Sequence, residues 1–140
     1  MVDKLDYIKK IDDKDFTEYI FTVDGYDISY SISYLKRKDE LFKYSFIYSK
    51  DFISFFPENT NGICEFDWDF VFDKPTEKIN IHKIFKYINE IGKIYLDEKK
   101  PDYVIFDAEE KKFRIQGRLL ENYGYIYVGK VENTYIFKRT

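Results

Sequence analysis

The chain has 140 residues, of which 44% are hydrophobic, 21% aromatic and 35% charged, and its net charge is −3. This length and composition predict one folded domain over residues 1–140 and exclude a disordered chain. The single cysteine and single histidine exclude an internal disulfide and a multi-cysteine zinc site, and the acidic balance disfavours binding to nucleic acid. With no bilayer-length apolar run and no signal-peptide pattern, we expect a cytoplasmic protein with no membrane partner.

The N-terminal half alternates apolar and polar residues, which is the pattern of half-buried strands. Strands are predicted over residues 16–23, 27–34 and 42–48, forming an antiparallel meander. Asp24–Gly25 predicts a tight hairpin between the first two strands, because glycine tolerates a positive φ. Before these strands, the spacing of Leu5, Ile8 and Ile11 allows a short helix.

A fourth strand is predicted over residues 65–73, with aromatic residues on one face and acidic residues on the other. If a metal site exists, Asp67 and Asp69 are its candidates, with Asp73 and Asp107 nearby, because carboxylates bind magnesium in nucleases. The alternative is a solvated polar strand face, and we expect no metal.

The C-terminal half changes to helical spacing after Pro75, and Asn80 is a plausible N-terminal cap for the first helix. The short apolar run at 103–106 is typical of a central strand that is buried on both faces. The predicted order is helix 79–98, strand 103–106, helix 109–122 and strands 125–131 and 134–139. The fold class is therefore mixed α+β or α/β, with a four-stranded N-terminal part followed by strands and helices in alternation.

Basic side chains gather on the second predicted helix. Arg114 and Arg118 are four residues apart, so they share a helical face, and Lys111 extends this patch. Guanidinium groups bind phosphate or carboxylate, so this patch is a candidate binding site, to which we add Lys78 before the first helix. The alternative for these residues is a solvated helix face.

The element order resembles that of GNAT-type N-acetyltransferases, and more closely that of degenerate GNAT-like proteins of bacteriophages. The resemblance covers about residues 62–140 and depends on 81–95, 99–106, Arg114, 118–120 and 123–125. In that family a glycine-containing loop before the long helix holds the pyrophosphate of acyl-CoA, whereas residues 73–80 here contain no glycine. The family's tyrosine general acid falls near Gln116 or Gly117, neither of which donates a proton in that way.

These departures favour a non-catalytic protein-interaction module, encoded by a phage and inhibiting or modulating a host protein, with no cofactor. The alternative is a divergent acyltransferase that binds acetyl-CoA near Lys78, Lys111 and Arg114 and uses Tyr123 or Tyr125 as proton donor. A third hypothesis is a magnesium-dependent nuclease that uses Asp67 and Asp69.

Aromatic residues are unusually abundant, with fourteen tyrosines and fourteen phenylalanines. Tyrosine favours protein interfaces because it joins a large apolar area to a polar tip. A compositional bias of an A/T-rich genome explains the same numbers equally well.

Cys64 is expected to be a buried, unreactive thiol, and no partner nucleophile is apparent for His82.

Overall fold

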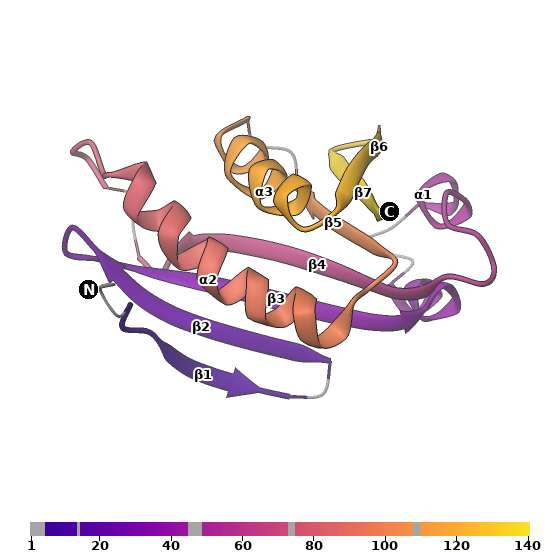
Figure 1. The fold of residues 1–140 in the computed structure, drawn as a ribbon, viewed down its shortest axis with the longest axis horizontal. Coiled ribbons are helices and arrows are strands. Elements are labelled where there is room, and N and C mark those ends of the chain that lie inside the picture. Colours follow the sequence, from indigo (N-terminus) through magenta and orange to yellow (C-terminus); the bar gives the residue numbers. More distant parts are fainter. Residues whose placement is uncertain (1–4, 14, 45–48, 73–74, 108–109) are drawn as a thin grey trace.

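The computed structural model describes residues 5–13, 15–44, 49–72, 75–107 and 110–140, which form a mixed α+β fold (Figure 1). One seven-stranded, mostly antiparallel sheet has the strand order β1-β2-β3-β4-β5-β7-β6. The strands are β1 (Ile8–Asp12), β2 (Phe16–Val23), β3 (Tyr26–Arg37), β4 (Asn61–Phe70), β5 (Tyr103–Asp107), β6 (Tyr125–Val131) and β7 (Thr134–Arg139). The helices are the 3₁₀ helix η1 (Lys38–Tyr44) and the α-helices α1 (Lys50–Ser54), α2 (Ile81–Lys99) and α3 (Glu110–Asn122).

One pair of neighbouring strands in this sheet is parallel. β4 and β5 pair in parallel from Ile63 with Tyr103 to Glu65 with Ile105, and α2 connects them. The other neighbouring strands are antiparallel and include two hairpins with two-residue turns, at Asp24–Gly25 and at residues 132–133. The predicted hairpin at Asp24–Gly25 is confirmed.

Local sequence signals explain the first hairpin and the ends of α2. Asp24 and Gly25 have φ values of 51° and 83°, which is the pair of positive values that this tight turn requires. The predicted cap, Asn80, accepts a hydrogen bond from the backbone N–H of His82 at 3.0 Å. α2 ends at Lys100, whose φ of 45° is left-handed and whose N–H donates to the Leu96 carbonyl.

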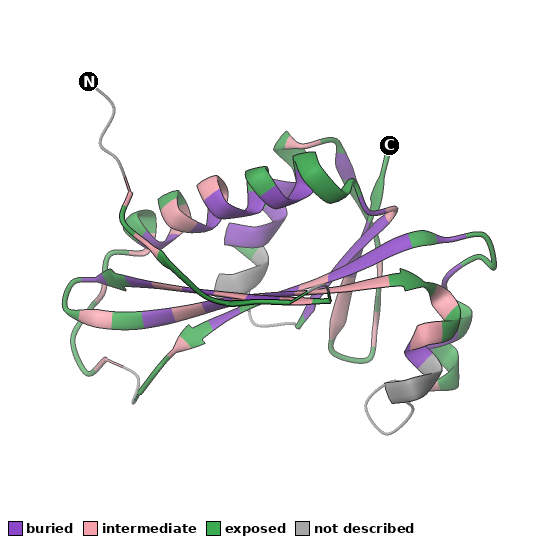
Figure 2. Cartoon of the chain, turned by 90° about the horizontal axis from the view of Figure 1, so that it is seen from below, coloured by how far each residue is buried: buried purple, intermediate pink, exposed green. Residues whose placement is uncertain are grey.

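The main hydrophobic core lies between the sheet and helices α2 and α3. Apolar residues of α2 recur every three or four positions, so one face of the helix is buried against the sheet. Buried residues from the strands complete the cluster, among them Tyr30, Phe66, Val104 and Phe106. Figure 2 shows the buried, purple side of α2 turned toward the sheet.

A second, smaller core lies on the opposite face of the sheet, where α1 and η1 pack. Its members are Leu41, Phe52, Ile53, Phe56, Ile63, Tyr103, Ile105 and Ile136. β5 therefore contributes alternate residues to both cores, which confirms the prediction of a central strand buried on both faces.

The strand predicted over residues 42–48 is wrong at residues 42–44. Residues 38–44 form the helix η1, and residues 45–48 lie outside the described residues. The physical reason is that β3 continues to Arg37, and the chain then turns under the sheet, where Leu41 becomes fully buried. An alternating pattern does not by itself supply a neighbouring strand with which to pair.

Two further predictions need correction at the N-terminal side of the sheet. The short helix suggested by Leu5, Ile8 and Ile11 is wrong, because residues 8–12 form β1 and pair with β2. That pairing satisfies backbone groups along β2 that a helix would leave exposed at the sheet edge. The strand expected at 65–73 instead spans 61–70, and Asp73 lies outside the described residues.

None of the helices in the described part of the chain is long and apolar enough to cross a membrane.

Candidate functional site

Among the strands that the structure describes, β6 is one of the two edges of the sheet, and its neighbour there is β7. Three successive apolar residues on it remain accessible: Ile126 is 51% exposed, Tyr127 47% and Val128 36%. The register with β7 shifts between Tyr127 and Gly129, so Val128 is an extra residue in a β-bulge. We call Ile126, Tyr127 and Val128 the β6 edge.

The opposite sheet edge, β1, differs from the β6 edge in its charge. Ile8 and Ile11 are also exposed there, but Lys9 and Lys10 lie between them. Lys9 forms an ion pair with Asp12 at 3.6 Å, and Lys10 forms one with Glu18 at 3.8 Å. Charged residues, and lysine above all, protect an edge strand against pairing with another chain. Strand β6 has no charged residue before Lys130, so the β6 edge is uncharged.

Aromatic rings support the β6 edge across three strands. The ring of Tyr127 lies 5.5 Å from that of Phe137 on β7, and Phe137 lies 5.6 Å from Phe106 on β5. Tyr135 adds a fourth ring, 5.9 Å from that of Tyr127. The ammonium group of Lys130 lies over the Tyr135 ring, 5.4 Å from its centre. Such contacts immobilise large side chains before any partner binds, which lowers the entropic cost of binding.

Helix α1 supports the other face of the same strand. A Cβ atom added at Gly129 would lie 3.5 Å from the ring of Phe55, so this ring packs directly over the strand backbone. Phe55 is itself 36% exposed. The apolar surface around the β6 edge is therefore built from two elements that are far apart in the sequence.

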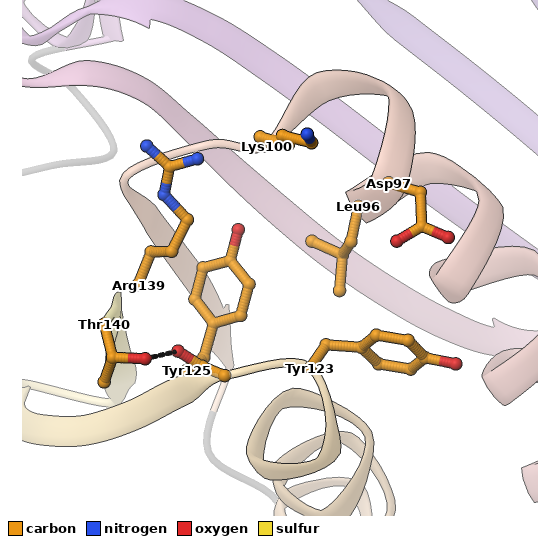
Figure 3. Close-up of a pocket in the computed structure, with 8 residues that line it drawn as sticks. Leu96, Asp97, Lys100, Tyr123, Tyr125, Arg139 and Thr140 are labelled. Carbon is orange, nitrogen blue, oxygen red and sulfur yellow. Dashed lines mark hydrogen bonds between the residues drawn. The ribbon is translucent and has the colours of Figure 1, made fainter.

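A pocket of about 210 Å³ lies where α2, α3, β6 and β7 meet (Figure 3). The pocket is lined by Leu96, Asp97, Lys100, Tyr123, Gly124, Tyr125, Arg139 and Thr140. Both tyrosines that the acyltransferase hypothesis names as proton donors therefore line one pocket. Tyr123 is half-buried, whereas Tyr125 is only 3% exposed.

The hydroxyl of Tyr125 has a structural partner. It donates a buried hydrogen bond of 2.7 Å to the carbonyl of Pro101, and burial raises the pKa of its phenol. A phenol held in this way anchors the start of β6 to the segment between α2 and β5. Of the two predicted donors, only Tyr123 has an accessible side chain.

One of the charged side chains that line this pocket, Arg139, is held by an ion pair. Arg139 forms an ion pair with Asp102 at 3.2 Å, and the other carboxylate oxygen of Asp102 accepts from the Asn61 N–H at 2.7 Å. Thr140 donates its hydroxyl to the Gly124 carbonyl at 2.6 Å, as Figure 3 shows. The C-terminal end of α2 also lies here, and the carbonyls at a helix C-terminus disfavour an anion.

Replacing Tyr125 with phenylalanine is expected to lower the free energy of unfolding by about 1–3 kcal/mol, because the buried Pro101 carbonyl loses its donor. Urea denaturation measures this change. Tyr123→Phe is the control, and we expect less than about 0.5 kcal/mol for this half-buried residue. Equal losses in both variants would contradict the anchoring role of Tyr125.

Lys78, which was added to the predicted basic patch, and the predicted proton donors lie at different ends of α2. Lys78 is exposed and precedes the N-terminus of this helix, while the pocket with Tyr123 lies at its C-terminus. Nineteen residues of α-helix span about 28 Å. Arg114 and Arg118 are exposed on α3, and the side chain of Lys111 lies outside the described residues.

The candidate metal ligands lie on the open face of the sheet, opposite α2. Asp67 and Asp69 are exposed, and Asp69 accepts a hydrogen bond from the Phe70 N–H at 2.9 Å. Among the residues that the structure describes, no three acidic, histidine or cysteine side chains are grouped so as to hold a metal ion. Within that part of the chain, these two aspartates belong to a polar strand face.

The single cysteine is fully buried, as predicted, and desolvation raises the pKa of the Cys64 thiol. This burial favours the inert thiol over the reactive thiolate. His82 is exposed in the first turn of α2, where its backbone N–H bonds the helix cap.

Sequence reasoning missed two features of this region. The β6 edge was predicted as a strand but not as the sheet edge, although the uncharged run 125–129 was a signal for it. The sequence interpretation places Gln116 only near the position of the family's catalytic tyrosine, yet the structure buries its side chain almost completely. A polar residue on the apolar face of a predicted helix was the available signal.

No family model matches this chain, and no curated protein sequence matches it significantly.

Proposed function

We propose that this chain is a non-catalytic protein-binding module on an acetyltransferase-like scaffold, that it is phage-encoded, and that it binds a host protein through the β6 edge. The observation that carries the proposal is the exposed, uncharged run of the β6 edge. The backbone of a terminal strand and its exposed apolar side chains together form a template to which a strand of another protein can pair.

The scaffold part of this proposal is supported by the order of the elements. The parallel pair β4–β5 with α2 between its strands, followed by α3 and the β6–β7 hairpin, is compatible with the GNAT resemblance. The non-catalytic part is supported by the chemistry of the site. Residues 73–80 contain no glycine, and Tyr125 is engaged with Pro101.

The test compares capture of partner proteins from a bacterial extract by the immobilised chain and two variants. We expect the double variant Ile126→Lys/Val128→Lys to retain less than about a tenth of the captured partner, a change of about 1.4 kcal/mol. The control is Ile94→Lys on α2, because Ile94 and Ile126 are both 51% exposed. It should capture as much as the original chain.

Thermal unfolding of all three proteins shows whether each is folded. Equal capture by the original chain and the β6 double variant would contradict the proposal. Equal loss in the double variant and in the Ile94 control would also contradict it, because the effect would then come from added charge and not from the β6 edge.

A divergent acyltransferase is the second candidate, favoured by the accessible Tyr123 in a pocket beside Lys100. If this function is correct, acetyl-CoA at millimolar concentration raises the melting temperature, because a ligand that binds only the folded state stabilises it by RT ln(1 + [L]/Kd). Our preferred function predicts no such shift, with or without magnesium. A concentration-dependent rise would replace it with the acyltransferase.

A further inference from the structure

Two polar side chains are enclosed in the main core, on β3 and on α3. Tyr30 on β3 is 0% exposed and Gln116 on α3 is 1% exposed. Within the described part of the chain, neither the Tyr30 hydroxyl nor the amide oxygen and nitrogen of Gln116 has a hydrogen-bond partner. Three unpaired polar atoms in one core are costly, because each has lost its contacts with solvent.

The two side chains meet from opposite sides of this core. The Gln116 amide lies near enough to the Tyr30 hydroxyl to oppose the rise in its pKa that burial causes, although the two groups do not complete a hydrogen bond. α2 crosses the same place at Gly92, where an added Cβ would lie 3.4 Å from the Tyr30 hydroxyl and 2.6 Å from Leu119. The polar atoms are therefore bounded by β3, α2 and α3.

The chemistry of these atoms defines what can join them. The amide oxygen needs a donor, the amide nitrogen needs an acceptor, and the phenol accepts either role. A neutral group with both donors and acceptors is required, because an ion would lose its hydration without a counter-charge. Water meets these conditions, and buried waters typically bond about three otherwise unpaired polar groups.

We propose that an internal water molecule binds between the Tyr30 hydroxyl and the Gln116 amide and joins β3 to α3 beneath the crossing of α2. This site is independent of the β6 edge and of the function proposed for it. It explains why a glutamine is tolerated on the buried face of α3, where Ile115, Leu119 and Leu120 are its buried neighbours.

The direct test is nuclear magnetic resonance of the complete ¹⁵N-labelled chain. We expect nuclear Overhauser cross-peaks between the side-chain NH₂ of Gln116 and water. Their sign should be the one that a long-lived contact between water and protein produces. The variant Gln116→Asn retains an amide but changes the chemical shifts of its side-chain NH₂ group. Comparison of the two spectra therefore identifies which NH₂ resonances belong to residue 116. Absence of these cross-peaks from an assigned Gln116 amide would overturn the proposal.

A second test asks whether replacing Gln116 raises or lowers the melting temperature. With water bound, Gln116→Met is expected to lower the melting temperature by about 3 °C or more, because the water and Tyr30 lose a partner. In a dry core the same change removes an unpaired amide and raises the melting temperature, which would also overturn the proposal. Leu119→Met on the same helix, equally buried, corrects for the effect of a methionine there. If Gln116→Met does not fold, Tyr30→Phe replaces it, with the same expected signs.

Discussion

Replacing Phe66 with alanine is expected to lower the free energy of unfolding by about 3–5 kcal/mol. Phe66 lies at the centre of β4 and is 1% exposed. Its ring contacts Tyr30 edge-on at 5.9 Å and Tyr95 edge-on at 6.2 Å, so it links β3, β4 and α2. The substitution removes the transfer free energy of a buried benzyl group and leaves a cavity between the sheet and α2, which the rigid strands cannot close.

Urea denaturation of the Phe66 variants measures this effect. Phe66→Leu is the matched control and should lose less than about 1.5 kcal/mol, since most of the apolar volume remains. The slope of the unfolding free energy against urea should stay unchanged, because the surface exposed on unfolding is nearly the same. A loss below about 1 kcal/mol for Phe66→Ala would contradict the tight packing of the main core.

Replacing Gly62 with valine is expected to lower the free energy of unfolding by about 3 kcal/mol or more, through two separate effects. Gly62 has a φ of 96°, and a side chain in a left-handed conformation costs about 1–2 kcal/mol. An added Cβ would also lie 3.0 Å from the Cα of Pro101 and 3.0 Å from the hydroxyl of Tyr34. Because the first contact is with backbone, the clash cannot be relieved by rotating a side chain.

Gly25 provides the matched control for the second effect. It also has a positive φ, of 83°, but nothing lies within 4 Å of an added Cβ. Gly25→Val should therefore show the cost of the backbone conformation without the clash. Thermal or urea unfolding of both variants measures the difference, and equal losses would contradict the close approach of β4 to Pro101.

The two stability predictions and the functional test address different parts of the protein. Phe66 and Gly62 act on the contacts of β4, whereas the β6 edge lies two strands beyond β5 at the end of the sheet. A Phe66→Leu variant that remains folded should therefore capture the proposed partner normally. This separation lets loss of binding be distinguished from loss of folding.

Much of the C-terminal half could be predicted from sequence because its signals are local. Helix α2 has an amphipathic repeat, a cap at Asn80 and a stop before Pro101, all of which act within a few residues. The β6–β7 hairpin spans the predicted residues for the same reason, since its turn and its alternating strands are adjacent in the chain. The Asp24–Gly25 turn is a third local signal that the structure confirms.

The candidate site could be predicted only in part. Sequence alone placed tyrosines in the C-terminal hairpin, but whether each is a donor, an anchor or a contact surface depends on its neighbours in space. Tyr125 meets a carbonyl 24 residues earlier in the chain, while Tyr127 lies at the sheet edge. No local pattern encodes either outcome.

The sequence by itself determined the secondary structure wherever hydrogen bonds close within a helix or across a tight turn. The tertiary structure alone decided which alternating segment becomes a strand, because a strand needs a partner. Residues 8–12 found one in β2, whereas residues 38–44 did not and turned under the sheet as η1. The tertiary structure also decided which strand is the edge of the sheet and which polar groups are enclosed in the core. Both follow from the order of the strands and the packing of the helices, and no single segment determines either.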